Sequence, residues 1–173
     1  MVTCEILSKL TGIPYTVGGP YEVCSDESGT NRITIWNVDV LGDAPTFDQI
    51  ETAALAVAKD NGILAATAAC DAVLAPYGAE YGAYEMATWD QQYAEALAYT
   101  ASPAADVPLL AAMCVARGIS IAELAGKIIA NRASWVALTG YVIGQRQRIV
   151  TQIEAATSVA EVEAVDMTIS LPG

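Results

Sequence analysis

The 173-residue sequence contains no histidine and only eight Lys and Arg residues. The lack of histidine excludes Ser-His and Cys-His mechanisms and removes the commonest metal ligand. Because nucleic acid binding needs clustered cations, the net charge of −12 argues against DNA or RNA as a partner. The longest apolar runs are far shorter than the roughly 20 residues of a membrane span, and the first residues do not resemble a signal peptide. We therefore expect no membrane insertion, and folding in the cytosol.

Catalytic and cofactor motifs are also lacking. The glycines form neither a dinucleotide fingerprint nor a phosphate loop, and no calcium-binding loop is present. Neighbouring acidic residues fall in an expected turn and on an expected surface helix, which favours solvated charge. We expect no catalytic residue, no metal and no cofactor. The most remote alternative is a small carboxylate-based enzyme or ligand-binding domain.

The cysteines are few and widely spaced, without any CxxC pair: Cys4, Cys24, Cys70 and Cys114. A four-thiolate metal site would need all four separate segments to meet, so free and mostly buried thiols are the simpler interpretation. A Cys4–Cys24 disulfide stays open for a protein that leaves the cell.

What the sequence does contain is 54% hydrophobic residues, enough to bury a core. Residues 21–24 and 33–38 are rich in β-branched and aromatic side chains, and residues 26–31 between them have the composition of a turn. This pattern predicts a β-hairpin. A two-stranded hairpin is only marginally stable in water, so we expect helices, further strands or another protein to cover it.

The rest of the chain has helical patterns. Thr46 and Gln49 predict a capping box for a helix that stops at Asn61-Gly62, and a second helix follows until Pro76. The fold class expected is α+β, mostly α. Its parts are a hairpin-and-helix module over residues 1–76, a linker over 77–87, and a helical domain over 88–173 that ends in a short strand.

One long helix has the most regular pattern, with steps alternating between three and four residues. Its members are Ile121, Leu124, Ile128, Asn131, Trp135, Leu138, Val142, Gln145 and Ile149. In one interpretation this seam packs inside the domain, with a helix break near Gly140 or Gly144. In the other it forms an intermolecular coiled coil, a dimer or trimer, in which Asn131 and Gln145 set the register.

Aromatic residues outside the seam complete the candidate protein interface, since Tyr and Trp are common anchors in such surfaces. Trp36 is expected on a strand whose two faces are both partly apolar, and Trp89 in a first helical turn. The tyrosines of the linker are either loop residues or anchors. The full candidate set is Trp36, Tyr81, Tyr84, Trp89, Ile128, Asn131, Trp135, Leu138, Val142, Gln145 and Ile149.

Several runs together resemble a helical domain that is common in tail-fibre and tail-fibre-assembly proteins of tailed bacteriophages. They are residues 88–99, 108–110, 116–119, 122–131 and 144–147. The resemblance covers roughly residues 86–165. A shorter run, Ile35-Trp36-Asn37-Val38 followed by Ala44-Pro45-Thr46, resembles the N-terminal module of small phage tail proteins.

The resemblance implies a structural protein of the phage tail, located at the tail fibre or at its attachment to the baseplate. Its partners would be other phage tail or fibre proteins, and it would be assembled in the host cytoplasm and reside in the virion. A tail-fibre assembly chaperone is the alternative. The resemblance brings no catalytic residue with it.

Overall fold

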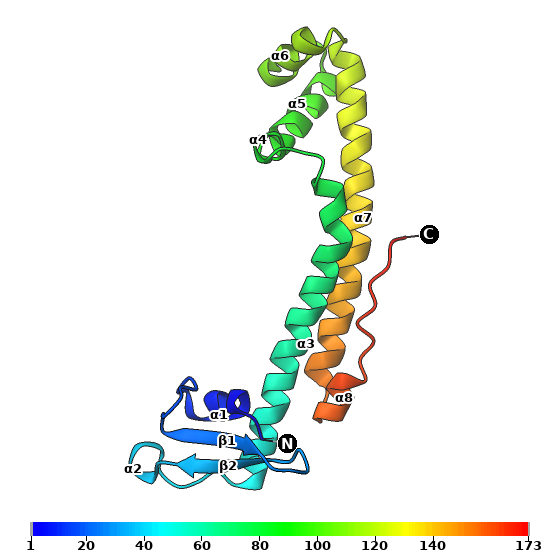
Figure 1. Ribbon diagram of the computed structural model, residues 1–173. Helices are drawn as coiled ribbons and strands as arrows, with labels where there is room; N and C mark the ends of the chain where they lie inside the picture. The colour runs from blue at the N-terminus through cyan, green and yellow to red at the C-terminus, as the bar shows by residue number, and fades with distance from the viewer. Residues whose placement is uncertain (1, 173) are drawn as a thin grey trace. The chain divides into compact units, whose positions relative to one another are not determined.

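The computed structural model describes residues 2–172 and is mostly helical with one small antiparallel sheet, which confirms the predicted α+β class. In chain order the elements are α1 (Cys4–Thr11), β1 (Tyr21–Ser25), β2 (Asn31–Trp36), α2 (Val38–Leu41), α3 (Phe47–Gly78), α4 (Ala83–Met86), α5 (Trp89–Ala101), α6 (Pro108–Arg117), α7 (Ile121–Ala155) and α8 (Val159–Glu163) (Figure 1).

The chain forms two compact units, and each contains two separate stretches of sequence. Unit 1 consists of Met1–Ala68 and Gln147–Met167, and unit 2 consists of Ala69–Arg146 and Thr168–Gly173. This division differs from the expected modules, because each unit joins two separate stretches of the chain. The segment predicted as a linker over 77–87 contains the end of α3 and all of α4. In the described part of the chain, no single helix has both the length and the apolar character of a membrane span.

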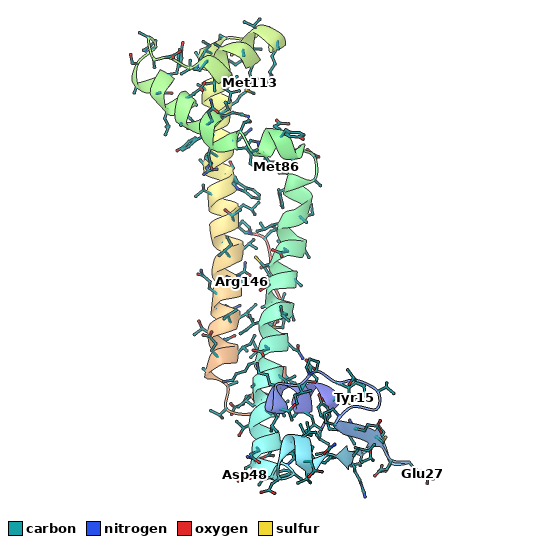
Figure 2. The ribbon with its side chains drawn as sticks, turned by 90° about the vertical axis from the view of Figure 1, so that its left-hand side faces the viewer. Tyr15, Glu27, Asp48, Met86, Met113 and Arg146 are labelled. Carbon is teal, nitrogen blue, oxygen red and sulfur yellow. The ribbon has the colours of Figure 1, made fainter. Side chains whose placement is uncertain are left out.

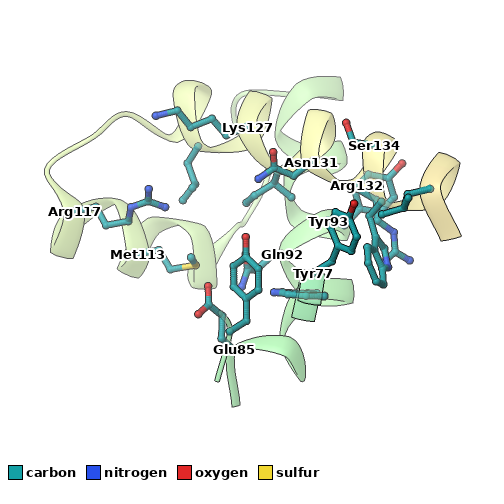
Figure 3. Close-up of a pocket in the computed structure, with 16 residues that line it drawn as sticks. Tyr77, Glu85, Gln92, Tyr93, Met113, Arg117, Lys127, Asn131, Arg132 and Ser134 are labelled. Carbon is teal, nitrogen blue, oxygen red and sulfur yellow. The ribbon is translucent and has the colours of Figure 1, made fainter. Parts of the chain in front are cut away.

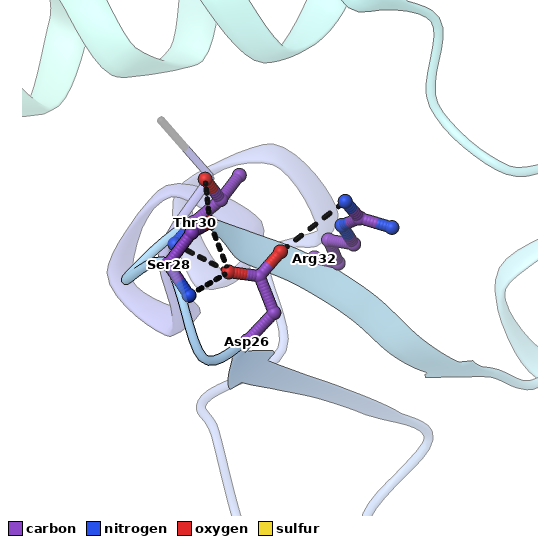
Figure 4. A network of polar contacts seen from close by, with 4 residues as sticks. All are labelled: Asp26, Ser28, Thr30 and Arg32. Atoms are coloured by element: carbon purple, nitrogen blue, oxygen red, sulfur yellow. Dashed lines mark hydrogen bonds and ion pairs between the residues drawn. The ribbon is translucent and has the colours of Figure 1, made fainter.

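The hairpin of unit 1 confirms the predicted strands. Tyr21 pairs with Trp36 and Ser25 with Asn31, and a bulge lies between Glu22 and Val23. Asp26 organises the turn, because its carboxylate accepts hydrogen bonds from Ser28 and Thr30 and pairs with Arg32 at 3.2 Å (Figure 4). These hydrogen bonds, first from the Ser28 hydroxyl and then from the Thr30 amide, lower the pKa of Asp26 below its ordinary value.

Helix α1, which the sequence analysis missed, covers the hairpin. Its Leu7 is completely buried against Tyr21, which is 1% exposed. The Tyr21 hydroxyl lies 2.7 Å from the Ser8 hydroxyl and donates to the Ile13 carbonyl at 2.7 Å. The hairpin therefore obtains the cover that it needs from the same chain, beside the first turns of α3 (Figure 1).

Helix α3 is a single helix where the sequence predicted two. Its start is as predicted, because Thr46 accepts from the Gln49 amide and Gln49 accepts from the Thr46 amide. Asn61-Gly62 does not stop it: a side chain at Gly62 would come within 3.1 Å of Ile153 Cδ1, so this glycine allows close packing within unit 1. Pro76 lies in the last turn of α3, two residues before the helix ends at Gly78.

Unit 2 contains a core between α5, α6 and the start of α7. Its buried members include Ala96, Leu110 and Leu124, none more than 2% exposed. Helix α6 ends at Gly118, whose φ of 66° is left-handed. Helix α5 begins without a capping box. Thr88 has helical backbone angles and makes no capping hydrogen bond, because its hydroxyl donates to the Glu85 carbonyl instead.

Helix α7 runs without a break through Gly140 and Gly144, so the predicted interruption is absent. No atom of another element lies within 4 Å of where a Cβ would stand at either glycine. The predicted terminal strand at 167–171 is also wrong. Residues 167–171 lie in no strand, and the side-chain amide of Gln145 hydrogen-bonds the backbone carbonyl and N–H of Ser170.

Candidate functional site

An open groove of about 750 Å³ lies on unit 2, between the α3 end, α5, the α6 end and one face of α7 (Figure 3). We call it the aromatic groove. It is lined by Tyr77, Tyr81, Glu85, Trp89, Gln92, Tyr93, Met113, Arg117, Leu124, Lys127, Ile128, Asn131, Arg132, Ser134, Trp135 and Leu138. The α7 members recur every three or four residues, so a single helix face supplies half of the wall.

Three aromatic rings of the groove pack one against the next. Tyr81 and Trp89 meet edge to face with centroids 5.2 Å apart, and Trp89 meets Trp135 in the same way at 6.4 Å. Such contacts are worth about 0.5–1.5 kcal/mol each beyond the buried area. They hold the rings in fixed positions, which reduces the entropy that a ligand would lose on binding them.

The charged side chains of the aromatic groove are mainly cationic. Arg117 and Lys127 lie toward one end and Arg132 toward the other, while Glu85 is its only acidic member (Figure 3). The Arg132 guanidinium stands 5.5 Å from the centroid of the Tyr93 ring, in cation–π geometry.

Two of these cations have carboxylate partners on the surface. Arg132 pairs with Asp90 at 3.1 Å, and Lys127 pairs with Glu123 at 2.7 Å. The hydrogen bond from Lys127 lowers the pKa of Glu123, so this carboxylate is charged at neutral pH. The carboxylates are 88% and 48% exposed, so solvent screens both pairs and each pair contributes little to stability. An incoming carboxylate can therefore replace either partner at little cost.

The structure brings six of the eleven candidate interface residues together in this groove: Tyr81, Trp89, Ile128, Asn131, Trp135 and Leu138. Tyr84, on α4, is not among the lining residues but is 93% exposed. Trp36 belongs to unit 1, where its ring packs against Tyr21 and its indole N–H donates to the Gly42 carbonyl at 2.9 Å.

The last three candidates make contacts within the chain. Val142 and Ile149 are completely buried in the single chain, so the C-terminal half of the seam is core. Gln145 donates to the Ser170 carbonyl at 2.8 Å and accepts from the Ser170 amide at 3.1 Å. Its amide thus holds the C-terminal segment instead of being available to set the register between chains, as the coiled-coil interpretation required.

Sequence reasoning missed the three cations of the groove and Tyr93. Lys127 and Arg132 flank seam positions, and Tyr93 follows Trp89 by four residues, so their helical spacing was visible. Arg117 gave no such signal, because it reaches the groove from α6 through tertiary packing. Within residues 2–172, no three acidic or cysteine side chains are grouped closely enough to bind a metal ion.

Comparison with known proteins gives one partial match. A family model described as the HI1402 helical domain matches residues 130–167, which is less than half of the chain. The matched region contains α7 from Ala130 to its end and all of α8, so the similarity concerns a helical segment. No curated protein and no solved structure matches the chain.

Proposed function

We propose that this protein is not an enzyme and acts by binding other protein chains through the aromatic groove. The observation that carries the proposal is the succession of Tyr81, Trp89 and Trp135 rings in an open groove. Aromatic residues and arginine are the commonest energetic centres of protein interfaces, and here both kinds line one surface. The exposed Tyr84 would extend this surface beyond the groove.

The resemblance to phage tail-fibre proteins suggests where such contacts would be made. In this proposal the protein is a structural part of the tail, at the fibre or its baseplate attachment, and its partners are other tail or fibre proteins. An assembly chaperone that binds fibres only during maturation would use the same groove. The net charge of −12 supports protein over nucleic acid as the partner.

Quantitative mass spectrometry of purified phage particles tests the proposal and separates its two forms. A structural component should be present at a fixed copy number per particle, whereas a chaperone should be found with fibre proteins in infected cells but not in particles. Absence from both would refute the phage assignment.

A pair of matched tyrosine variants tests the groove. Tyr81→Ala should reduce recovery of the partner by about tenfold or more, because Tyr81 is 40% exposed at the groove. Tyr141→Ala is the control, since Tyr141 is 48% exposed on α7 and does not line the groove. Equal recovery with both variants would show that binding uses another surface.

A further inference from the structure

A short surface segment of unit 1 combines exposed apolar side chains with acidic residues. We call residues 38–48 the acidic segment. Val38 and Val40 are each 59% exposed and Phe47, the only phenylalanine of the chain, is 71% exposed. Large apolar side chains that are exposed to this degree within one short segment are candidates for an interaction site.

The charge of the acidic segment is of one sign. It contains Asp39, Asp43 and Asp48, the last of them in the first turn of α3 (Figure 2). The sequence has no Lys or Arg between Arg32 and Lys59. The segment therefore presents apolar groups and carboxylates together, without cations among them.

The acidic segment is held in place by contacts within unit 1. Leu41 packs against the core formed by Tyr21 and Leu7, and the Gly42 carbonyl accepts the hydrogen bond from Trp36. The Asn37 side chain caps α2 by accepting from the Asp39 amide at 3.1 Å. A segment that is already ordered loses less entropy when it binds.

The aromatic groove of unit 2 has the complementary chemistry. Three of the eight basic residues of the chain line it, namely Arg117, Lys127 and Arg132, beside an aromatic wall. We propose that the acidic segment of one copy of this protein binds in the aromatic groove of a second copy. Phe47 and the two valines contact the aromatic rings, and the aspartates pair with the groove cations. This rests on the proposed protein-binding function and names the partner.

Such a contact joins two different surfaces, so the association is head-to-tail. A pair of copies keeps one unused groove and one unused segment, and the assembly therefore grows until it closes into a ring or continues as a filament. This differs from the coiled-coil dimer or trimer expected from the seam, because α7 of one copy does not need to pack along α7 of another.

Two double charge-reversal variants of the full chain test the proposal. Asp39→Lys with Asp43→Lys changes the segment, and Arg117→Glu with Lys127→Glu changes the groove. Analytical ultracentrifugation should show concentration-dependent association of the unaltered protein that weakens as salt rises. Each variant alone should associate at least about tenfold more weakly, because like charges then face each other. Mixing the two variants should restore association, since each then provides the complement of the other.

The control variant carries the same change of charge elsewhere on α7. Arg146→Glu with Arg148→Glu lies outside the groove lining and should associate like the unaltered protein. Circular dichroism of all variants should show that they remain helical, and a variant that unfolds is replaced by the milder Arg117→Gln with Lys127→Gln.

Three results would overturn the proposal: a monomer at every concentration, association that the control variant weakens equally, or no recovery on mixing. A monomer that still binds tail or fibre proteins through Tyr81 would reject the second copy as the occupant and leave the proposed function intact. If Tyr81→Ala and Tyr141→Ala recover the partner equally while the unaltered protein self-associates as expected, the proposed function is rejected and the second copy remains as the occupant of the groove.

Discussion

Replacing Glu95 with alanine should destabilise unit 2 by about 2 kcal/mol. Glu95 is only 9% exposed, and its carboxylate accepts the Leu110 amide at 2.9 Å and the Gln91 side-chain amide at 3.0 Å. Leu110 is the third residue of α6, so the carboxylate serves as the cap that Val107 cannot provide.

The magnitude follows from the group that is left without a partner. Loss of the carboxylate leaves the Leu110 N–H buried and unpaired, which costs about 1–3 kcal/mol. A negative charge at a helix N-terminus adds about 0.3–1 kcal/mol, which is also lost. A loss of 2 kcal/mol lowers the folding equilibrium constant about 30-fold. Glu95→Gln keeps one acceptor and should cost about half as much.

Urea denaturation followed by tryptophan fluorescence measures this effect, because Trp89 and Trp135 are both in unit 2. Glu80→Ala is the matched control, since Glu80 is exposed in the turn after α3. A change below about 0.5 kcal/mol for Glu95→Ala, equal to that of the control, would show that the capping interaction does not stabilise α6.

Further predictions concern the seam, the glycines of α7 and the hairpin turn. Ile149→Ala should cost about 2–5 kcal/mol in urea denaturation at any protein concentration, whereas Val136→Ala, at a 55% exposed position, should change stability by less than about 0.5 kcal/mol. A cost for Ile149→Ala that depends on concentration would instead indicate an intermolecular seam. Gly140→Ala should stabilise the protein by about 0.5–1 kcal/mol, because the added methyl meets no neighbour, and destabilisation would reveal an unseen contact at that face. The lowered pKa of Asp26 means that its carboxylate stabilises the folded state above the ordinary value of 3.8, and that this stability is lost as the pH falls through the lower folded pKa. Asp26→Asn should therefore flatten the acid side of the thermal unfolding profile, and an unchanged profile would contradict the assignment.

The sequence by itself determined those elements whose cause is local. The hairpin follows from β-branched runs around a turn, the start of α3 from the Thr46–Gln49 capping box, and the end of α6 from Gly118. The seam also identified one face of α7, because a helix repeats its faces every three to four residues whatever it packs against.

Only the tertiary structure decided what each face contacts. The local sequence at Gly62 predicts the end of a helix. Helix α3 nevertheless continues, because Ile153 and Val162 pack where a side chain would stand. One seam lines an open groove at Trp135 and is core at Val142, a difference that periodicity cannot express. The groove itself unites side chains from five helices, α3 to α7, because the packing of α5 and α6 on α7 brings distant positions such as Tyr93 and Arg132 together.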